Sequence, residues 1–343
     1  MLCIGKMSMR KIPTGTGQKP HFFQRLFEIP ETTVILPLIV LAGLAWLLNP
    51  VFVKPANLVS ITRIMVLYGF LAIGETFIII VDEIDISVGS MVAFAAMFFA
   101  YLLNHAQFHW IPALLLTFAL AVGLSLINGL CVVKLNIPAF ITTIAMLYIC
   151  RGGARALTFA KPISVMKAAG AGPFIKFGTA PILGGLGWGF VFLIAGIAIA
   201  QLVLKKTAFG RKVYATGDSL PAARYSGVNT DRIKLSAYLI SGVMVGMTAM
   251  FLLGREVSAN PNTGDGWEMY VIAACAIGGV SMTGGSGSMV GTLCGVAMMA
   301  TIQNVLNMLA VNSNWQSVVV GLMIIAAVVL DVVRRNRKFG AIG

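Results

Sequence analysis

The amino-acid sequence predicts an all-α integral membrane protein with about ten transmembrane helices. Of its 343 residues, 58% are hydrophobic and only 11% are charged, whereas about 25% of the residues in a soluble domain are charged. The mean hydropathy is +0.90. The apolar residues also gather in runs of about twenty, the length that an α-helix needs to cross a bilayer. A multi-pass membrane protein accounts for all of these observations.

The predicted spans follow from these apolar runs in chain order. They cover residues 33–53, 59–81, 86–103, 112–133, 138–158, 188–204, 235–254, 269–284, 288–310 and 315–333. A polar arm, 1–32, precedes the resulting transmembrane domain, 33–333, and a basic tail, 334–343, follows it. No small-residue cleavage site follows the first apolar run, so we expect the first span to remain in the mature protein.

The distribution of lysine and arginine predicts that both termini are cytoplasmic. Basic residues gather in the arm, in the connection 205–234 and in the tail, and with an even number of spans these three segments share one side. Short basic segments face the cytoplasm. The lysines of 159–187 fall on the other side and oppose this orientation, but the majority decides it. The net charge of +13 therefore reflects membrane topology and lipid contact, and nucleic acid is not an expected partner.

The sequence lacks the motifs of an enzyme or a cofactor-binding protein. The five cysteines show no CxxC spacing, and HxxxH at 105–109 has no acidic third ligand nearby. Neither GxSxG nor HExxH occurs, and the glycine-rich stretches do not match GxxxxGK[ST]. We therefore expect no catalytic residue, no metal site and no cofactor in this chain.

Three acids, Asp82, Glu83 and Asp85, stand between apolar runs and require an explanation. In one interpretation they lie in the cytoplasmic headgroup region, solvated or paired with basic groups, with Asp85 accepting backbone N–H bonds near Val88 as a helix cap. In the other, one of them faces a substrate path, because polar groups at a helix break often line cavities.

The segment "KKTAFGRKVYATGDSLPAARYSGVNTDRIKLSAYLISG" predicts a short helix in the basic connection. Ser219 is suited to the N-cap and Pro221 to the first turn, and Gly227 to the end of the helix. Such a helix is either a docking element for a partner or part of an ordinary basic loop on the membrane surface.

Three segments, "EIDISVGSMVAF", "ATGDSLPAARYSGVNTDRIKLSAYLISG" and "NPNTGDGWEMYVIAACAIGGVSMTGGSGSMVGTLCG", resemble the ribose-type sugar permeases of bacterial ABC importers. The resemblance implies a permease of roughly ten helices in the bacterial inner membrane, which acts as a transport subunit. It implies three partners: a separate ATPase chain that holds ATP and Mg, a periplasmic solute-binding protein, and a second permease subunit, identical or paralogous. Asp82 and Glu83 depart from the pattern, because the family usually has small residues there, and they demand water or a basic partner.

The resemblance also implies that the helix Ser219–Gly227 seats in a groove on the ATPase. The residues assigned to ATPase coupling are Gly217, Ser219, Pro221, Ala222, Ala223, Arg224, Tyr225, Ser226 and Gly227. Within this assignment, Arg224 is expected to pair with an acidic residue of the groove.

The expected solute is a small hydroxylated molecule, a monosaccharide or a polyol, because a zwitterion would need compensating charges inside the bilayer. The candidate substrate-path residues are Asp85, Ser87, Asn128, Phe140, Trp267, Gln303, Asn304 and Asn307. In the alternative interpretation, the amides hydrogen-bond to neighbouring helices.

A second candidate function is an ion-coupled secondary transporter that uses Asp82, Glu83, Asp85 or Glu75 as protonation sites.

Overall fold

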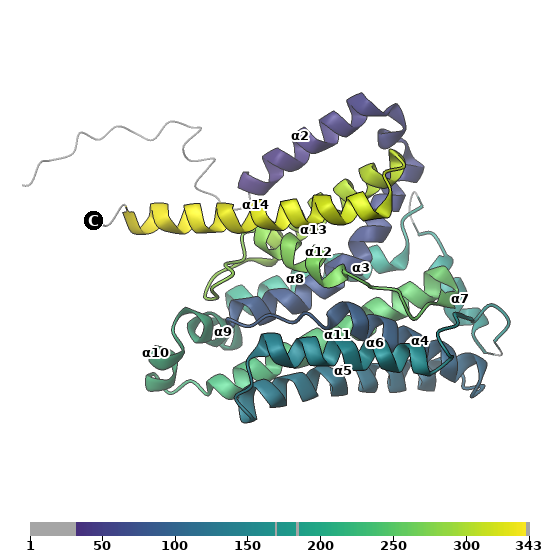
Figure 1. The fold of residues 1–343 in the computed structure, drawn as a ribbon, viewed down its shortest axis with the longest axis horizontal. Coiled ribbons are helices and arrows are strands. Elements are labelled where there is room, and N and C mark those ends of the chain that lie inside the picture. The colour runs from purple at the N-terminus through teal and green to yellow at the C-terminus, as the bar shows by residue number, and fades with distance from the viewer. Residues whose placement is uncertain (1–31, 169, 183–184, 341–343) are drawn as a thin grey trace, which may run out of the picture.

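The computed structural model describes residues 32–168, 170–182 and 185–340, and within them the chain is mostly helical (Figure 1). Five of the described helices are long and apolar enough to cross a membrane: α3 (Pro55–Ile80), α5 (Trp110–Lys134), α8 (Trp188–Lys206), α11 (Thr230–Glu256) and α13 (Met289–Met308). The remaining large helices are α2 (Thr32–Leu48), α4 (Val88–Asn104), α6 (Ala139–Ala156), α12 (Trp267–Ile277) and α14 (Ser313–Gly340). The predicted arm lies outside the described residues except for Thr32, and α14 continues into the predicted tail.

Each predicted apolar run contains one of these helices, but the span predicted at 269–284 is wrong in length. Helix α12 ends at Ile277 and has 11 residues, which corresponds to about 16 Å at 1.5 Å per residue and therefore to about half of a hydrocarbon core. The glycines that follow explain the ending, because Gly279 has a φ of +84°. A β-carbon at Gly278 would lie 2.5 Å from the Gly291 oxygen.

The structure adds small elements that the apolar pattern does not predict. Two-residue strands β1 (Ile163–Ser164) and β2 (Ser258–Ala259) pair antiparallel. Three short helices complete the described chain besides the 3-10 turn η1 (Pro50–Val53): α7 (Gly172–Thr179), α9 (Ala208–Asp218) and α10 (Leu220–Tyr225). Both α9 and α10 lie in the basic connection.

Helix α3 forms the centre of the bundle and contacts α8, α11, α12 and α13. Its large apolar side chains Phe70, Phe77 and Ile78 are fully buried. Small residues allow its neighbours to approach closely, as expected for helices packed in a membrane: a β-carbon at Gly74 would lie 2.7 Å from the Cα of Ser241 in α11.

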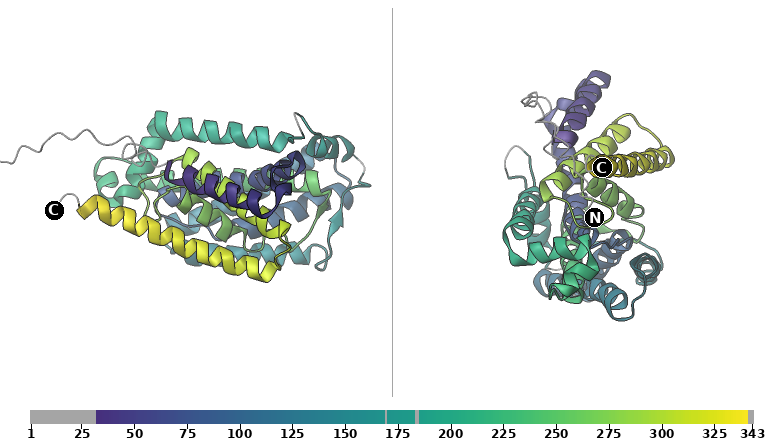
Figure 2. Two further views of the ribbon diagram at one scale, coloured as in Figure 1. Left: turned by 90° about the horizontal axis from the view of Figure 1, so that it is seen from above. Right: turned by 90° about the vertical axis from the view of Figure 1, so that its left-hand side faces the viewer.

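The two ends of the bundle differ. Helices α9 and α10 lie at the same end as the C-terminal end of α14, and α7 lies at the opposite end (Figures 1 and 2). Among the non-helical stretches of the described chain are residues 81–87, before α4, and residues 260–266, before α12. These two interruptions position the functional site.

Candidate functional site

The two interruptions bring the starts of α4 and α12 together, and we call residues 81–90 and 260–268 the half-helix junction. A β-carbon at Gly89 would lie 2.2 Å from the Gly264 oxygen, and one at Gly264 would lie 2.4 Å from the Gly89 oxygen. Gly264 also has a φ of +73°, a conformation that favours glycine. Helix N-termini carry partial positive charge, and the Glu268 carboxylate lies there, 2.6 Å from the β-carbon position of Gly89.

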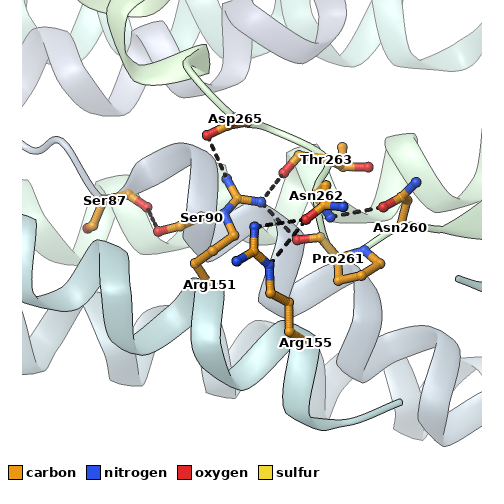
Figure 3. A network of polar contacts seen from close by, with 9 residues as sticks. All are labelled: Ser87, Ser90, Arg151, Arg155, Asn260, Pro261, Asn262, Thr263 and Asp265. Carbon is orange, nitrogen blue, oxygen red and sulfur yellow. Dashed lines mark hydrogen bonds and ion pairs between the residues drawn. The ribbon is translucent and has the colours of Figure 1, made fainter. Parts of the chain in front are cut away.

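Two arginines of α6 hold the second stretch of the junction in place (Figure 3). Arg151 Nη1 donates to the Pro261 oxygen at 2.9 Å and to the Thr263 oxygen at 2.7 Å. Its Nη2 lies 3.9 Å from Asp265 Oδ1. Arg155 donates from Nε and Nη2 to Asn262 Oδ1 at 3.2 and 3.0 Å. A buried guanidinium thus replaces the helical hydrogen bonds that this stretch lacks.

An aromatic cluster, formed by Tyr68, Trp267 and Tyr270, borders the junction. The Tyr68 ring meets the Trp267 ring edge-on at 5.6 Å and stacks on the Tyr270 ring at 5.3 Å. The Tyr68 hydroxyl donates to Gln303 Oε1 at 2.5 Å. Nearby in the chain, the Asp265 side chain is 90% exposed. The partly exposed rings of Trp267 and Tyr270 offer stacking to a polar solute, while the buried Tyr68 ring packs against both of them.

Asp85, Ser87 and Asn128 form a separate, fully buried network. Ser87 donates to Asp85 Oδ1 from its backbone N at 2.8 Å and from its Oγ at 2.5 Å. Asn128 Nδ2 donates to Ser87 Oγ at 3.0 Å. The expectation that Asp85 lies in the solvated headgroup region is therefore wrong. Asp85 does accept a backbone N–H near the start of α4, but from Ser87 and not from Val88.

Asp82 and Glu83 have a different environment from Asp85. Glu83 forms an ion pair with Lys234 of α11, and their side chains are 12% and 18% exposed. Lys234 is thus the basic partner that the departure from the family pattern demanded. Burial raises the pKa of Glu83, and Lys234 acts in the opposite direction. Asp82 is exposed, with a φ of 63°.

The remaining predicted path residues belong neither to the aromatic cluster nor to the network of Asp85, Ser87 and Asn128. Asn304 exchanges hydrogen bonds with Asn57 at 3.0 and 2.9 Å, and Asn307 Oδ1 accepts from Gln316 Nε2 at 3.0 Å. These contacts fit the alternative interpretation, in which the amides tie neighbouring helices together. Phe140, in the first turn of α6, is 59% exposed.

Sequence reasoning missed the residues that organise the junction. Arg151, Asp265 and Glu268 were not singled out, and Glu75 was considered only for the ion-coupled alternative. One signal was available: ionisable residues inside apolar runs are rare and usually mark functional sites, and this applies to Arg151 and Glu75. The second stretch of the junction gave no comparable signal, because its partners lie far away in the sequence.

The short helix predicted in the basic connection is confirmed as α10. Ser219 Oγ accepts from the Ala222 N at 3.4 Å, Pro221 lies in the first turn and Ser226 is the C-cap. Gly227 follows with a φ of +78°. Ala223 faces inward and Tyr225 is 92% exposed.

Arg224 has partners within the chain. It donates from Nε to Thr230 Oγ1 at 3.0 Å and pairs through Nη2 with Asp231 Oδ1 at 3.2 Å. Because Thr230 and Asp231 begin α11, Arg224 joins α10 to that helix.

Helix α9 connects α10 to the core. A β-carbon at Gly217 would lie 1.7 Å from the Ile80 oxygen and 2.7 Å from the Gly285 N. The Ile80 oxygen, at the end of α3, accepts from that same Gly285 N at 3.0 Å. The Tyr214 hydroxyl donates to the Gly287 oxygen at 2.8 Å. The short helices are thus seated on α3 and on the glycine-rich turn before α13.

A multi-pass helical bundle, a half-length helix α12 that meets the start of α4 at a polar junction, and a short helix at one end are typical of membrane transport proteins. The chain belongs to the family described as "branched-chain amino acid transport system / permease component", which matches residues 57–328.

Several characterised relatives are similar over nearly the whole chain. The ribose import permease protein RbsC of Bacillus subtilis (strain 168) is 34% identical, over 92% of this chain and 96% of that protein. The RbsC protein of Escherichia coli (strain K12) is 32% identical, over 93% and 98%. The autoinducer 2 import system permease protein LsrC of Yersinia enterocolitica is 33% identical, over 88% and 82%. No solved structure matches the chain.

Proposed function

We propose that this chain is the membrane-spanning permease subunit of an ATP-binding-cassette importer. It translocates a small hydroxylated solute, a monosaccharide or a polyol, which a periplasmic binding protein delivers. ATP and Mg are bound by a separate ATPase chain, and a second permease subunit, identical or paralogous, completes the conduit. The observation that carries the proposal is α10, a capped helix that presents Tyr225, 92% exposed, in a chain that belongs to a permease family.

The proposed topology has about ten spans in a bacterial inner membrane, with both termini cytoplasmic. The common location of α9, α10 and the end of α14 supports it (Figure 1), because the basic connection and the basic tail then share the cytoplasmic side. Helices α4 and α12 each cover part of the thickness and meet at the junction, as half-helices do at the centre of many transporters.

A sugar-like solute is supported by two observations. The relatives with the names quoted above import ribose and autoinducer 2, and the aromatic cluster offers ring faces next to the Gln303 amide. We therefore place the solute path beside Tyr68, Trp267 and Gln303. The family name mentions branched-chain amino acids, but a zwitterion would require both of its charges to be compensated.

The proposal is tested by uptake into proteoliposomes that contain the permease with or without its ATPase and binding protein. We expect ATP-dependent accumulation only in the complete system, and no effect of an uncoupler. Accumulation by the chain alone that collapses with an uncoupler would support the ion-coupled alternative and would contradict the proposal.

Tyr225 provides a specific test of ATPase coupling. Tyr225→Ala removes an exposed aromatic side chain from α10 without disturbing its caps, so the fold should be retained. Because buried aromatic residues often dominate an interface, we expect binding of the ATPase to weaken by about tenfold or more. The measurement is ATPase pull-down together with solute-stimulated ATP hydrolysis. Tyr148→Ala, which removes another exposed tyrosine side chain (71% exposed) from α6, serves as the control. Equal binding by Tyr225→Ala and wild type would count against docking at α10.

Trp267 provides a test of the solute path. In Trp267→Ala the edge-on contact with Tyr68 is lost, and we expect uptake to fall by about tenfold, since an aromatic contact contributes about 0.5–1.5 kcal/mol beyond burial. Trp267→Phe should retain most of the uptake. Trp188, which stacks on Phe177 at 5.8 Å in another part of the protein, supplies the control, Trp188→Ala. Uptake that fell equally in both alanine variants would argue for a structural role only.

A further inference from the structure

The carboxyl group of Glu75 lies against the backbone of Asp85 in the interior, so two buried acids are close neighbours. Both residues are fully buried, and the Asp85 N donates to Glu75 Oε1 at 3.1 Å. Asp85 Oδ1 accepts both hydrogen bonds from Ser87. The second oxygen of each group, Glu75 Oε2 and Asp85 Oδ2, is buried and has no hydrogen-bond partner. A buried oxygen of an ionised carboxyl group without a partner is costly.

Other buried polar atoms without partners lie around this pair: Ser125 Oγ, Asn128 Oδ1 and the Tyr238 hydroxyl. Asn128 reaches Asp85 through Ser87, and Ser125 precedes Asn128 by about one turn on α5. A β-carbon at Gly129 would lie 3.1 Å from the Tyr238 side chain. These contacts place α5 and α11 against the same pair of acids.

No basic side chain compensates this pair among the described residues. Lys234 pairs with Glu83, and Arg151 is engaged with the stretch 261–265. The other titratable groups that interact electrostatically with Glu75 or Asp85 are weak acids, namely Tyr238, Cys150 and Cys275. Two adjacent carboxylates in an apolar interior cannot both remain ionised without a compensating charge.

We propose that Glu75 holds a bound proton beside an ionised Asp85, so that the two buried acids together carry a single negative charge. Asp85 remains ionised, because its Oδ1 accepts two hydrogen bonds and because it lies just before the positive N-terminal end of α4. Protonation removes the charge from the Glu75 carboxyl group, whose buried Oε2 has no hydrogen-bond partner. The proton neutralises one charge of the pair and need not move during transport, so this inference is independent of the energy source proposed above.

A sodium ion is the competing occupant, because all of the unpartnered buried atoms around the pair are oxygens, the ligands that hard cations prefer. A sodium ion would leave both acids ionised. Infrared spectroscopy separates the two cases, since only a protonated carboxyl group gives the C=O stretch of a carboxylic acid.

The experiment compares the infrared difference spectra of the purified full-length protein and its Glu75→Gln variant at neutral pH, in H2O and D2O. We expect wild type to show a carboxylic-acid C=O band that shifts in D2O and is absent from Glu75→Gln. Glu268→Gln is the matched control, because Glu268 is a second buried glutamate with an unpartnered Oε2, and it should retain the Glu75 band.

The folding of the variant does not limit this test. If Glu75→Gln does not fold, glutamate labelled with carbon-13 at the side-chain carboxyl group, introduced into the Glu268→Gln background, should shift the same band. The absence of any band assignable to Glu75 would overturn the inference. So would a band that appears only when choline replaces sodium, because that result would assign the site to a sodium ion.

Discussion

Replacing Arg151 with methionine is expected to abolish uptake and to lower the stability of the permease. The variant keeps a long side chain but loses the hydrogen bonds to the Pro261 and Thr263 oxygens. Each hydrogen bond from a charged donor contributes about 1.5–3 kcal/mol, so the loss of two corresponds to about 3–6 kcal/mol at the half-helix junction. Without them, the Pro261 and Thr263 oxygens lose their charged donor, and within the described chain the stretch 260–266 keeps only its own turn hydrogen bonds and the contact of Asn262 with Arg155. Thermal unfolding in detergent and ATP-dependent uptake are the measurements.

Two further variants make this prediction specific. Arg155→Gln affects an exposed contact with Asn262 and should change the unfolding temperature little, since exposed contacts contribute little. Arg151→Lys keeps the charge but not the planar guanidinium group that donates to two carbonyl oxygens at once. We therefore expect losses of uptake and stability between those of wild type and Arg151→Met. If Arg151→Met retained wild-type uptake and stability, the junction would not depend on this clamp.

The positions of the large helices could be predicted because a bilayer imposes a simple rule on composition. Each run of apolar residues had to become a helix, since no other structure satisfies its backbone in lipid. The two interruptions fall between predicted spans, but their meeting at one junction and the early end of α12 could not be predicted in the same way. The stretch 81–87 is short and flanked by ordinary apolar residues, and α12 is followed by a run that is apolar enough to suggest a longer span. Their ends are set by tertiary contacts, such as that between Gly89 and Gly264.

The candidate sites show the same difference between features that local sequence determines and features that long-range contacts determine. Helix α10 was predictable because capping residues act locally: Ser219, Pro221 and Gly227 lie within a few residues of the backbone groups they satisfy or the turns they allow. The role of Arg151 was not predictable, because its acceptors are backbone oxygens 110 and 112 residues away in the sequence. Amides such as Asn304 illustrate the opposite error: their chemistry suits a solute, but a neighbouring helix already satisfies them.

The structure also connects α10 to the junction through α11. Arg224 of α10 is bound to Thr230 and Asp231 at the start of α11. One turn further, Lys234 is paired with Glu83, which lies in the first stretch of the junction. A displacement of α10 by a partner would therefore reach residues 81–87 through two adjacent ion pairs. Glu83, one of the two acids that depart from the family pattern, thus takes part in a physical link between the two sites.

Gly217→Ala is expected to disrupt the other connection, between α9 and α3. The added methyl group would lie 1.7 Å from the Ile80 oxygen and 2.7 Å from the Gly285 N, and backbone atoms cannot rotate away as a side chain can. Overpacking of this kind costs about 1–3 kcal/mol, although alanine favours a helix over glycine by about 1 kcal/mol. We expect α9 and α10 to shift away from α3, with ATPase binding and uptake falling by about tenfold or more if at least 1.4 kcal/mol is lost.

The matched control for this prediction is Gly123→Ala in α5, another helical glycine, which has nothing within 4 Å of its β-carbon position. This variant gains the helix propensity of alanine without a clash, so its stability should be unchanged or slightly higher. A difference between the two variants in uptake and in ATPase pull-down therefore isolates the close contact of Gly217 from the general effect of replacing a glycine. If both variants behaved like wild type, the close contact of α9 with the end of α3 would not be required for uptake. Movement of the short helices would then have to reach the core through α11 alone.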